Sequence, residues 1–403
     1  MSAHRHWACA LVLAYGAPAL AQEARPLRWA DVVVAIDRDP RVAASRSRLR
    51  AAEGGLSAVR TPPNPELEAT IGRGVAQEGP ARRAEWGLAL TVPLEWLARR
   101  GPEIDAARAT VEEAAAEAQA LRAEVSAELW RLHVRAGYAH SEVEALEATE
   151  RQVEALTHLV RRRVEAGEGR PVEIPRVELE LERVRNEVAS ARAGRDGALA
   201  QLGAWLAVSI QRVELPAPLP PVETVAAARE LTKHPRLRAA LARAEAAKAE
   251  ASAARRSRVP GITGGASYAS ALDREAVGGR VAVELPLWDW KSGRVQRAEA
   301  SAAAEASRAD AEGRALAAGI AEAAASCSRA RTVADRQQTS ILPRAEESAR
   351  TLERTFQLGE AGILDVIDAR RVLLQARREF LSSARERDVD CGALILLSGR
   401  ELP

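Results

Sequence analysis

Apolar residues recur at every seventh position along the first half of the chain. Nine of them follow one another at this spacing from Ile104 to Val160, and no proline stands between Pro102 and Pro171. A strict seven-residue repeat keeps one face of a helix against a partner only when the helices supercoil. The pattern therefore predicts a helix far longer than those of ordinary globular domains, packed in a coiled coil.

Glycine turns divide this pattern into paired helices. The turn of the first half contains Gly167, Gly169 and Arg170 and is followed by a second apolar stripe. The turn of the second half runs from Gly359 to Gly362 and is followed in the same way. Glycine suits a chain that leaves a helix and folds back. We predict two helical hairpins, over about residues 101–208 and 292–398.

Short segments with a period of two precede each hairpin. Apolar residues alternate with polar or small ones from Trp86 to Trp96 and, more briefly, from Leu67 to Ile71. The same alternation occurs from Val281 to Leu287, and the run upstream of it is rich in glycine, alanine and serine. A period of two is typical of a strand with one apolar face. We predict strands over about residues 65–75, 85–96, 262–272 and 278–288.

The predicted strands have the length at which a tilted strand crosses a bilayer, roughly ten residues. Trp86, Trp96, Trp288 and Trp290 lie at or beside their ends, where aromatic residues anchor membrane strands. The alternative is a small soluble sheet packed on the helices. Four strands cannot close a barrel, and an open edge in hydrocarbon leaves backbone groups without partners. Three copies would supply twelve strands, so we expect other copies to complete the sheet.

The two halves of the chain look like copies of one plan. Three landmarks recur in order: Pro40 and Pro235, Pro93 and Pro286, Gly167 and Gly359. The offset between partners stays between 192 and 195 residues, which is too long for a solenoid repeat. We divide the mature chain into a first structural repeat at residues 22–208, a Pro-rich linker at 209–221 and a second repeat at 222–403.

The start of the chain is typical of an export signal. Residues 1–21 combine Arg5 with an apolar run and end in the small-residue pattern Ala19-Leu20-Ala21. Cys9 lies inside the run, so we expect it to be removed with this signal peptide. No later apolar stretch approaches the roughly 18 residues of a membrane-spanning helix. We therefore expect export without an inner-membrane anchor.

The distribution of charge and the spacing of reactive side chains argue against several classes of function. The 58 basic and 56 acidic residues are interleaved along the helices, whereas a nucleic-acid surface needs segregated basic residues. His133 and His140 are seven residues apart, but ligand pairs on a helix sit four apart. We therefore expect no metal site and no cofactor. No catalytic constellation occurs, so we expect no enzyme.

Cys327 and Cys391 are the cysteines that remain after the signal peptide. If the helices on either side of a turn near Glu360 run antiparallel, the two thiols lie at similar heights. A disulfide could then form in an oxidising periplasm. We favour two buried free thiols over this disulfide.

Duplicated halves of helix, strand hairpin, long helix, glycine turn and returning helix resemble the TolC family of outer-membrane efflux channels. The most specific segment, Gly359 to Ala369 (GEAGILDVIDA), is similar to the family's G-x-x-x-(I/L)-x-D-V-L-D-A. Leu27 to Pro40 resembles the family's first helix, and Pro286 to Val295 resembles its strand-to-helix junction. That junction and Arg163 to Gly167 are most similar to the CzcC and CusC branch, which serves heavy-metal cation exporters.

The resemblance implies a homotrimer in the outer membrane of a Gram-negative bacterium, with a twelve-stranded β-barrel that continues into an α-helical tunnel through the periplasm. It implies a periplasmic adaptor (membrane fusion protein) and, through it, an inner-membrane pump of the RND type. The pump would supply the energy, and the channel would conduct its substrates passively, heavy-metal cations in this branch. The turns at residues 167–171 and 359–362 would face the adaptor, and the strand loops at 76–83 and 273–277 would face outside.

The resemblance also implies site residues. Asp365 and Asp368 match the aspartates that narrow the family's periplasmic aperture, and Glu173 matches the acidic position of the first tip. In a trimer these aspartates would form a ring that favours cations. The alternative is an ordinary acidic first turn that complements the helix dipole. Ala361 stands where some members carry an arginine, and Arg170 is a candidate substitute.

A second function class is a periplasmic coiled-coil scaffold or adaptor without a pore. An adaptor should show one helical hairpin flanked by the halves of a lipoyl-like β domain, whereas this sequence predicts two hairpins. The sequence leaves open the exported substrate, the cognate pump and adaptor, and whether the resting channel is open or closed.

Overall fold

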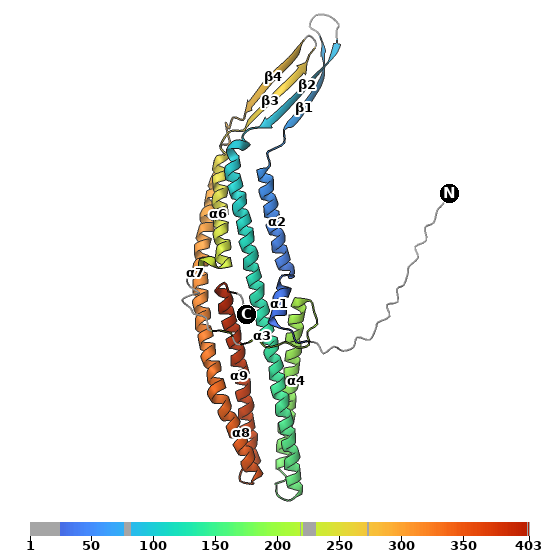
Figure 1. Cartoon of the computed structure of the whole chain (residues 1–403), viewed down its shortest axis with the longest axis vertical. Helices are drawn as coiled ribbons and strands as arrows, with labels where there is room; N and C mark the ends of the chain where they lie inside the picture. The colour runs from blue at the N-terminus through green and yellow to red at the C-terminus, as the bar shows by residue number, and fades with distance from the viewer. Residues whose placement is uncertain are drawn as a thin grey trace, which may run out of the picture.

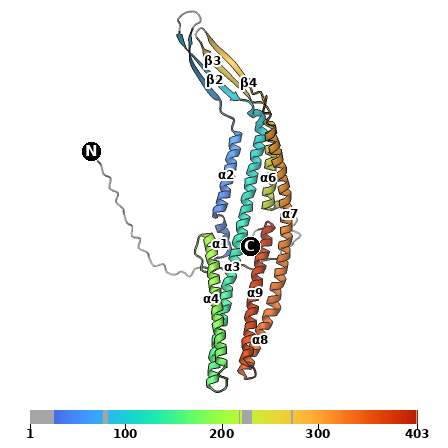
Figure 2. The ribbon, with the colours of Figure 1, turned by 180° about the vertical axis from the view of Figure 1, so that it is seen from behind.

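A computed structural model describes residues 25–75, 82–217, 219–220, 231–271, 274–400 and 402. The molecule is long and narrow. A four-stranded sheet stands at one end, and helices run from it to two hairpin turns at the other end (Figure 1 and Figure 2). The predicted signal peptide with Cys9 lies outside the described residues, as do residues 76–81 and 273 of the predicted strand loops and residue 272 at the end of a predicted strand.

The two halves follow the same order of elements. The first half consists of α1 (Trp29–Ile36), α2 (Pro40–Arg60), β1 (Glu66–Val75), β2 (Arg82–Pro93), α3 (Trp96–Glu165) and α4 (Glu173–Leu206). The second half consists of the 3-10 turn η1 (Leu231–Lys233), α6 (Pro235–Arg256), β3 (Ile262–Ser270), β4 (Glu275–Val283), α7 (Ser292–Arg336), the π-helical turn η2 (Gln337–Ile341), α8 (Leu342–Gln357) and α9 (Ile363–Leu397). The predicted fold class, mainly helical with duplicated helical hairpins and a small sheet, is confirmed.

The equivalent helices α2 and α6 begin with the same kind of cap. The carboxylate of Asp39 accepts a hydrogen bond from the backbone nitrogen of Arg41 at 2.8 Å. His234 Nδ1 accepts one from the backbone nitrogen of Arg236 at 3.2 Å. In both helices a proline fills the first helical position, where no N–H donor is needed. Different side chains thus perform the same task at the two matching sites.

The sheet joins the two halves. Its strands are antiparallel in the order β1-β2-β3-β4, so the strand hairpin of each half pairs with the other through β2 and β3. Trp86 on β2 stands opposite Ile71 on β1 and Ser270 on β3. Among the described residues β1 and β4 have one neighbouring strand each, so the sheet of a single chain is open at both edges.

Two predicted strand ends are wrong. β2 ends at Pro93, so Trp96 begins α3 instead of ending a strand. β4 ends at Val283, so Trp288 lies in the connection to α7. The apolar alternation continues past both ends. One backbone bond follows each strand, from Leu94 N to the carbonyl oxygen of Ile262 at 2.6 Å and from Glu284 N to that of Gly261 at 2.8 Å, and the chain then leaves the sheet.

Two predicted starts also differ from the structure. β4 begins at Glu275, so part of the segment predicted as an external loop at 273–277 belongs to the strand. α3 begins before residue 101 and contains Pro102 within its first turns.

In the second half, the π-helical turn η2 ends at Ile341, two residues before Pro343, which cannot donate a backbone hydrogen bond.

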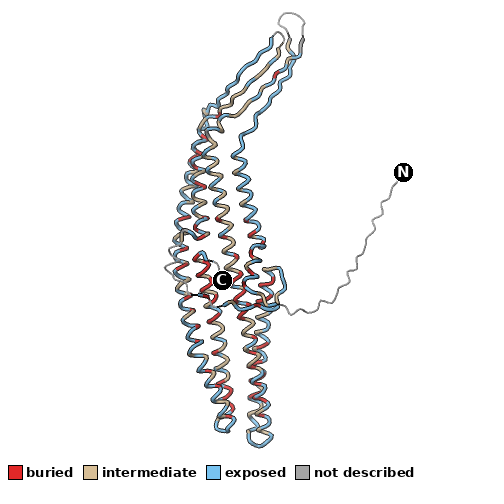
Figure 3. Tube along the Cα trace, viewed as in Figure 1, coloured by how far each residue is buried: buried red, intermediate tan, exposed pale blue. Residues whose placement is uncertain are grey.

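α3 is the central helix of the molecule, and it packs against α2, α4, α6 and α9. Near its middle, Trp130 Nε1 donates a hydrogen bond to the carbonyl oxygen of Asp388 at 2.9 Å. Gly392 makes room for the indole, because a Cβ at this position would clash with Trp130. Buried residues recur along the helices, most densely in the half of the molecule that contains α4 and α9, whereas most of the sheet is exposed (Figure 3). No helix in the described ranges is long and apolar enough to cross a membrane.

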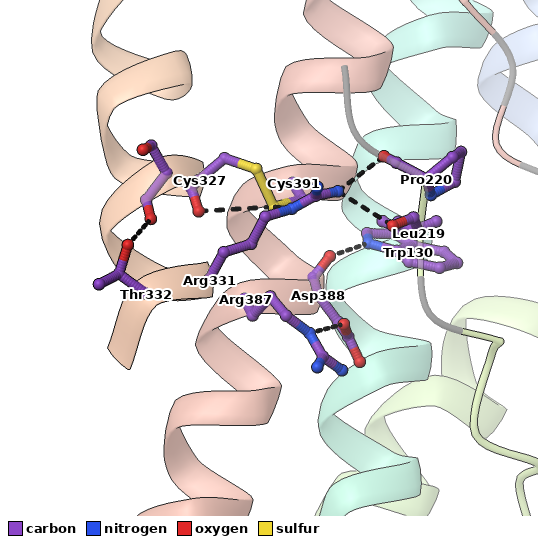
Figure 4. Close-up of a disulfide and its surroundings, with 10 residues drawn as sticks. Trp130, Leu219, Pro220, Cys327, Arg331, Thr332, Arg387, Asp388 and Cys391 are labelled. Carbon is purple, nitrogen blue, oxygen red and sulfur yellow. Dashed lines mark hydrogen bonds and ion pairs between the residues drawn. A yellow bond between two sulfur atoms is a disulfide. The ribbon is translucent and has the colours of Figure 1, made fainter. Parts of the chain in front are cut away.

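Cys327 of α7 and Cys391 of α9 form a disulfide (Figure 4), so the prediction of two free thiols is wrong. The two helices pack against each other, and the Cα atoms of the cysteines are 4.7 Å apart, within the range that a disulfide spans. Next to the disulfide, Arg331 Nη2 donates to the carbonyl oxygens of Leu219 and Pro220 at 2.9 and 2.6 Å. The linker between the halves is thereby fixed at the same level.

Candidate functional site

The hairpin turns lie at the end of the molecule farthest from the sheet (Figure 1). Each turn depends on one glycine in the left-handed region of backbone conformation, Gly167 with φ 78° and Gly359 with φ 81°. Glycine adopts this conformation without steric cost and is common just after a helix. The two glycines are among the landmarks that revealed the duplication, and they perform the same task in both halves.

A small hydrophobic cluster joins the two tips. It draws on both hairpins and consists of Leu156, Val160, Val177, Phe356, Ile363, Val366 and Ile367. Val160, Val177 and Val366 are fully buried. Because burial of apolar surface stabilises the folded arrangement, separating the tips would expose this cluster to water at a cost.

Two arginines also connect the hairpins near the tips. Arg163 Nη1 donates to the carbonyl oxygen of Phe356 at 2.9 Å, and its guanidinium lies 4.8 Å from the centre of the Phe356 ring. Arg371 on α9 binds both carboxylate oxygens of Glu180 on α4, at 3.0 Å from Nε to Oε1 and 2.6 Å from Nη2 to Oε2. The hydrogen bonds that Arg371 donates to Glu180 raise the pKa of Arg371 above its ordinary value. These charge-assisted bonds hold the first hairpin against the second.

Asp365 and Asp368 are both exposed in the first turns of α9. Asp365 Oδ2 accepts a hydrogen bond from the backbone nitrogen of Gly362 at 3.0 Å, so this carboxylate caps the helix. Asp368 lies 3.7 Å from Arg371, and its side chain is 72% exposed. Asp365 thus stands in the first turn of α9, as the helix-dipole alternative also expected, and both carboxylates remain accessible on the surface of the chain.

Glu173 and Arg170 belong to the other tip. Glu173 begins α4, and its Oε2 would be 3.3 Å from a Cβ at Gly169, so a glycine leaves room for this carboxylate. Arg170 is exposed. Within the described chain no hydrogen bond or ion pair connects Glu173 with Asp365 or Asp368. A single chain thus places the predicted acidic residues on two neighbouring tips without joining them.

Sequence reasoning missed Arg371 and Glu180. Glu180 stands three residues after Val177 and four before Val184, so it lies on the apolar face of α4. An acidic residue inside an apolar stripe indicates a buried partner, and this signal was present in the sequence. Arg371 carries no comparable signal, because it is one of many arginines on α9.

The aromatic residues predicted for the membrane interface lie at the sheet end of the molecule. Trp86 on β2 packs against Tyr268 on β3, with ring centres 5.1 Å apart. Trp96 stands at the start of α3. Trp288 and Trp290 are 91% and 63% exposed in the connection between β4 and α7. Trp96, Trp288 and Trp290 therefore gather where the sheet meets the helices.

The two histidines considered as metal ligands have different surroundings. His133 is fully buried beside Trp29 and Trp130, and burial lowers its pKa to about 4. His140 Nε2 lies 3.4 Å from Glu144 Oε1. In the part of the chain that the structure describes, no group of three or more His, Cys, Asp or Glu side chains is placed to hold a metal ion.

Comparisons with known proteins agree with this architecture. The cobalt-zinc-cadmium resistance protein CzcC of Cupriavidus metallidurans is 26% identical over 348 residues, which cover 84% of this chain and 82% of CzcC. The outer membrane protein VceC of Vibrio cholerae has the same fold, with a TM-score of 0.77 at 18% identity over 93% of this chain and 97% of VceC. CusC superposes with a TM-score of 0.75 at 18% identity, over 93% and 92% of the two chains.

The match to a family is found in both halves. The sequence pattern of the family described as "Outer membrane efflux protein" matches residues 32–208 and, separately, residues 227–400. These two ranges take in the hairpins, the strands and both tips. The chain therefore belongs to the family of outer membrane efflux proteins.

Proposed function

We propose that the protein is a homotrimeric exit channel in the outer membrane. The sheet carries this proposal, because it is open at both edges and one of its faces is apolar and exposed. Leu67, Ile71, Val277 and Val281 on that face are 70%, 86%, 84% and 75% exposed. In hydrocarbon an open edge costs several kcal/mol for each unpaired backbone group. Three copies joined edge to edge close a twelve-stranded barrel that presents these residues to lipid.

The helices of three copies then continue the barrel as a tunnel through the periplasm. The direction of the hairpins supports this arrangement, because all the long helices lie on the same side of the sheet (Figure 2). Leu179 on α4 and Val372 on α9 are 71% and 60% exposed near the tips. Large exposed apolar side chains are typical of surfaces that a partner covers, and a neighbouring copy would cover these.

The narrowest part of the tunnel is assigned to the tips. Asp365, Asp368 and Glu173 of three copies would surround the axis there and attract cations. Two features support this assignment: the aspartates are exposed, and they stand at the end of the molecule that lies farthest from the membrane strands.

The channel works with partners in this proposal. A periplasmic adaptor contacts the turns at Gly167, Gly169, Arg170, Gly359 and Gly362, and an RND-type inner-membrane pump supplies the energy. The substrates are heavy-metal cations. The similarity to CzcC, whose name describes resistance to cobalt, zinc and cadmium, supports this substrate class.

Conductance in planar lipid bilayers tests the proposal. We expect the purified protein to form channels that divalent cations block, and the variant with Asp365→Ala and Asp368→Ala to lose the block and conduct more. The matched control replaces Asp105 and Asp196 with alanine, since both are exposed acidic residues away from the tips. Recovery of the protein in the soluble extract, without channels, would favour the periplasmic scaffold. Equal block in both double variants would contradict the aperture.

A further inference from the structure

The face of the sheet opposite the apolar one carries small and charged residues. Strand register places two rows of residues across this face: Glu66, Thr91, Gly265 and Arg280 in one row, and Glu68, Ala89, Ser267 and Gly278 in the next. Strands in membrane barrels turn apolar residues to lipid and polar residues to the interior. This face therefore lines the lumen, an assignment that rests on the proposed function.

One ion pair crosses the lumenal face from edge to edge. Arg280 Nη1 on β4 lies 3.8 Å from Glu68 Oε2 on β1, although β2 and β3 stand between these strands. The side chains can meet only because the sheet curves towards this face and because the residues between them, such as Ala89 and Gly265, are small.

Glycines permit this curvature. A Cβ at Gly87 would lie 2.7 Å from Thr70 Oγ1, and a Cβ at Gly265 would clash with the carbonyl oxygen of Leu90. Glycine within a strand often marks a place where another part of the backbone approaches closely. The concave side of the sheet is thus the side on which Glu68 and Arg280 meet.

We propose that Glu68 and Arg280 set the preference of the barrel lumen for cations or anions. Strand register places three acidic residues, Glu66, Glu68 and Glu85, and two basic residues, Arg83 and Arg280, on this face. Charges of both signs therefore lie on the lumenal face, and Arg280 offsets part of the negative charge of the glutamates. This selectivity element lies in the membrane, at the opposite end of the molecule from the aspartates of the tips.

The solvent exposure of Glu68 and Arg280 indicates that the pair affects passing ions more than the stability of the fold. The side chains of Arg280 and Glu68 are 58% and 60% exposed, and exposed ion pairs contribute little to stability. Their charges project into the lumen, whose walls of low dielectric constant focus the electric field. The pair acts on passing ions far more than on the fold.

The test measures the reversal potential of the purified full-length protein in planar bilayers under a potassium chloride gradient. Arg280→Ala removes three positive charges from the trimer, each about 10 Å from a passing ion, and with screening the ratio of cation to anion permeability should rise about fourfold. Glu68→Gln should lower the ratio by a similar factor. Arg280→Lys keeps the charge and should leave the ratio near that of the unmodified protein.

Arg73→Ala is the matched control. Arg73 lies on β1 in the same row as Ala84, on the lipid side of the sheet, so its removal changes net charge equally without changing the lumen. Channels whose permeability ratio stays the same in Arg280→Ala and Glu68→Gln would overturn the inference and leave the channel proposal intact. Absence of channels from the unmodified protein would overturn the channel proposal itself. If Arg280→Ala fails to assemble, Glu68→Gln still decides the outcome.

Discussion

The bond between Arg371 and Glu180 should hold the two hairpin tips together. Arg371→Ala leaves the Glu180 carboxylate, which is only 8% exposed, without its main partner. Removing one partner of a buried ion pair costs about 3–5 kcal/mol. Arg371 is itself 46% exposed, and Arg183 remains 3.7 Å from the carboxylate, so we expect about 2 kcal/mol here. This is roughly a thirtyfold shift from joined towards separated tips.

Distances between spin labels measure this shift. Cysteines introduced at Glu168 and Glu360 place one label on each turn, where both residues are exposed. Cys327 and Cys391 are held in their disulfide and do not react with the label. In the Arg371→Ala variant, labelled chains diluted into unlabelled copies should gain population at longer distances by about the factor given above.

Two further variants isolate the cause. Replacing Glu180 and Arg371 together with leucine should recover most of the joined population, because no unpaired charge remains buried. Arg192→Ala is the matched control, since Arg192 pairs with Glu147 at 2.7 Å within the first hairpin and does not connect the two hairpins. An unchanged distance distribution in Arg371→Ala would refute the reasoning and leave the hydrophobic cluster as the contact that holds the tips.

Three other measurements follow from the structure. Gly359→Ala forces a side chain to adopt φ 81°, so thermal unfolding should show a loss of about 1 kcal/mol. Replacing Cys327 and Cys391 with serine opens a loop of 64 residues and should cost up to about 4 kcal/mol; reactive thiols in the unfolded, unreduced protein would contradict the disulfide. The pKa of His133 in the folded chain, about 4, lies below its ordinary value of 6.5, so protonation favours unfolding. Stability should fall as the pH drops from about 6.5 towards 4, and His133→Leu should remove up to about 3 kcal/mol of this loss in pH-dependent unfolding.

The seven-residue and two-residue periods predicted the elements because each element buries one continuous face. Val125, Val153 and Val160 lie on the predicted stripe of α3, and all are buried. The strand ends were wrong because the apolar alternation continues after β2 has ended at Pro93 and β4 at Val283. A period reports which face is apolar and not where backbone hydrogen bonds end.

Contacts between elements were harder to predict than the elements. The equal heights of Cys327 and Cys391 followed from the turn position, but whether the two side chains meet depends on the rotation of α7 and α9 about their axes. The bond between Arg371 and Glu180 depends on the same rotation, applied to α4 and α9. Periodicity constrains that rotation only within the width of the apolar stripe, which is wide enough to include or miss a single side chain.

The contacts that hold α9 differ between its middle and its end at the tip, and this difference predicts how the tips separate. At the middle level, the disulfide of Cys391 fixes α9 to α7, and Asp388 accepts hydrogen bonds from Trp130 and Tyr138 on α3. Near the tips, α9 is held to the first hairpin by one small cluster and by Arg371. Between the two levels, Arg378 binds Glu142 and Glu187 at 3.2 and 3.3 Å through partly exposed side chains. The weaker contacts break first, so α9 should pivot about its middle level when the tips part.

Labels at the middle level test this pivot. Arg131 on α3 and Glu386 on α9 are exposed at the height of Trp130 and Asp388. Arg371→Ala should leave the distance between these labels unchanged while the distance between the turns increases. A parallel increase at both levels would contradict the pivot, because it would mean that α9 leaves α3 along its whole length.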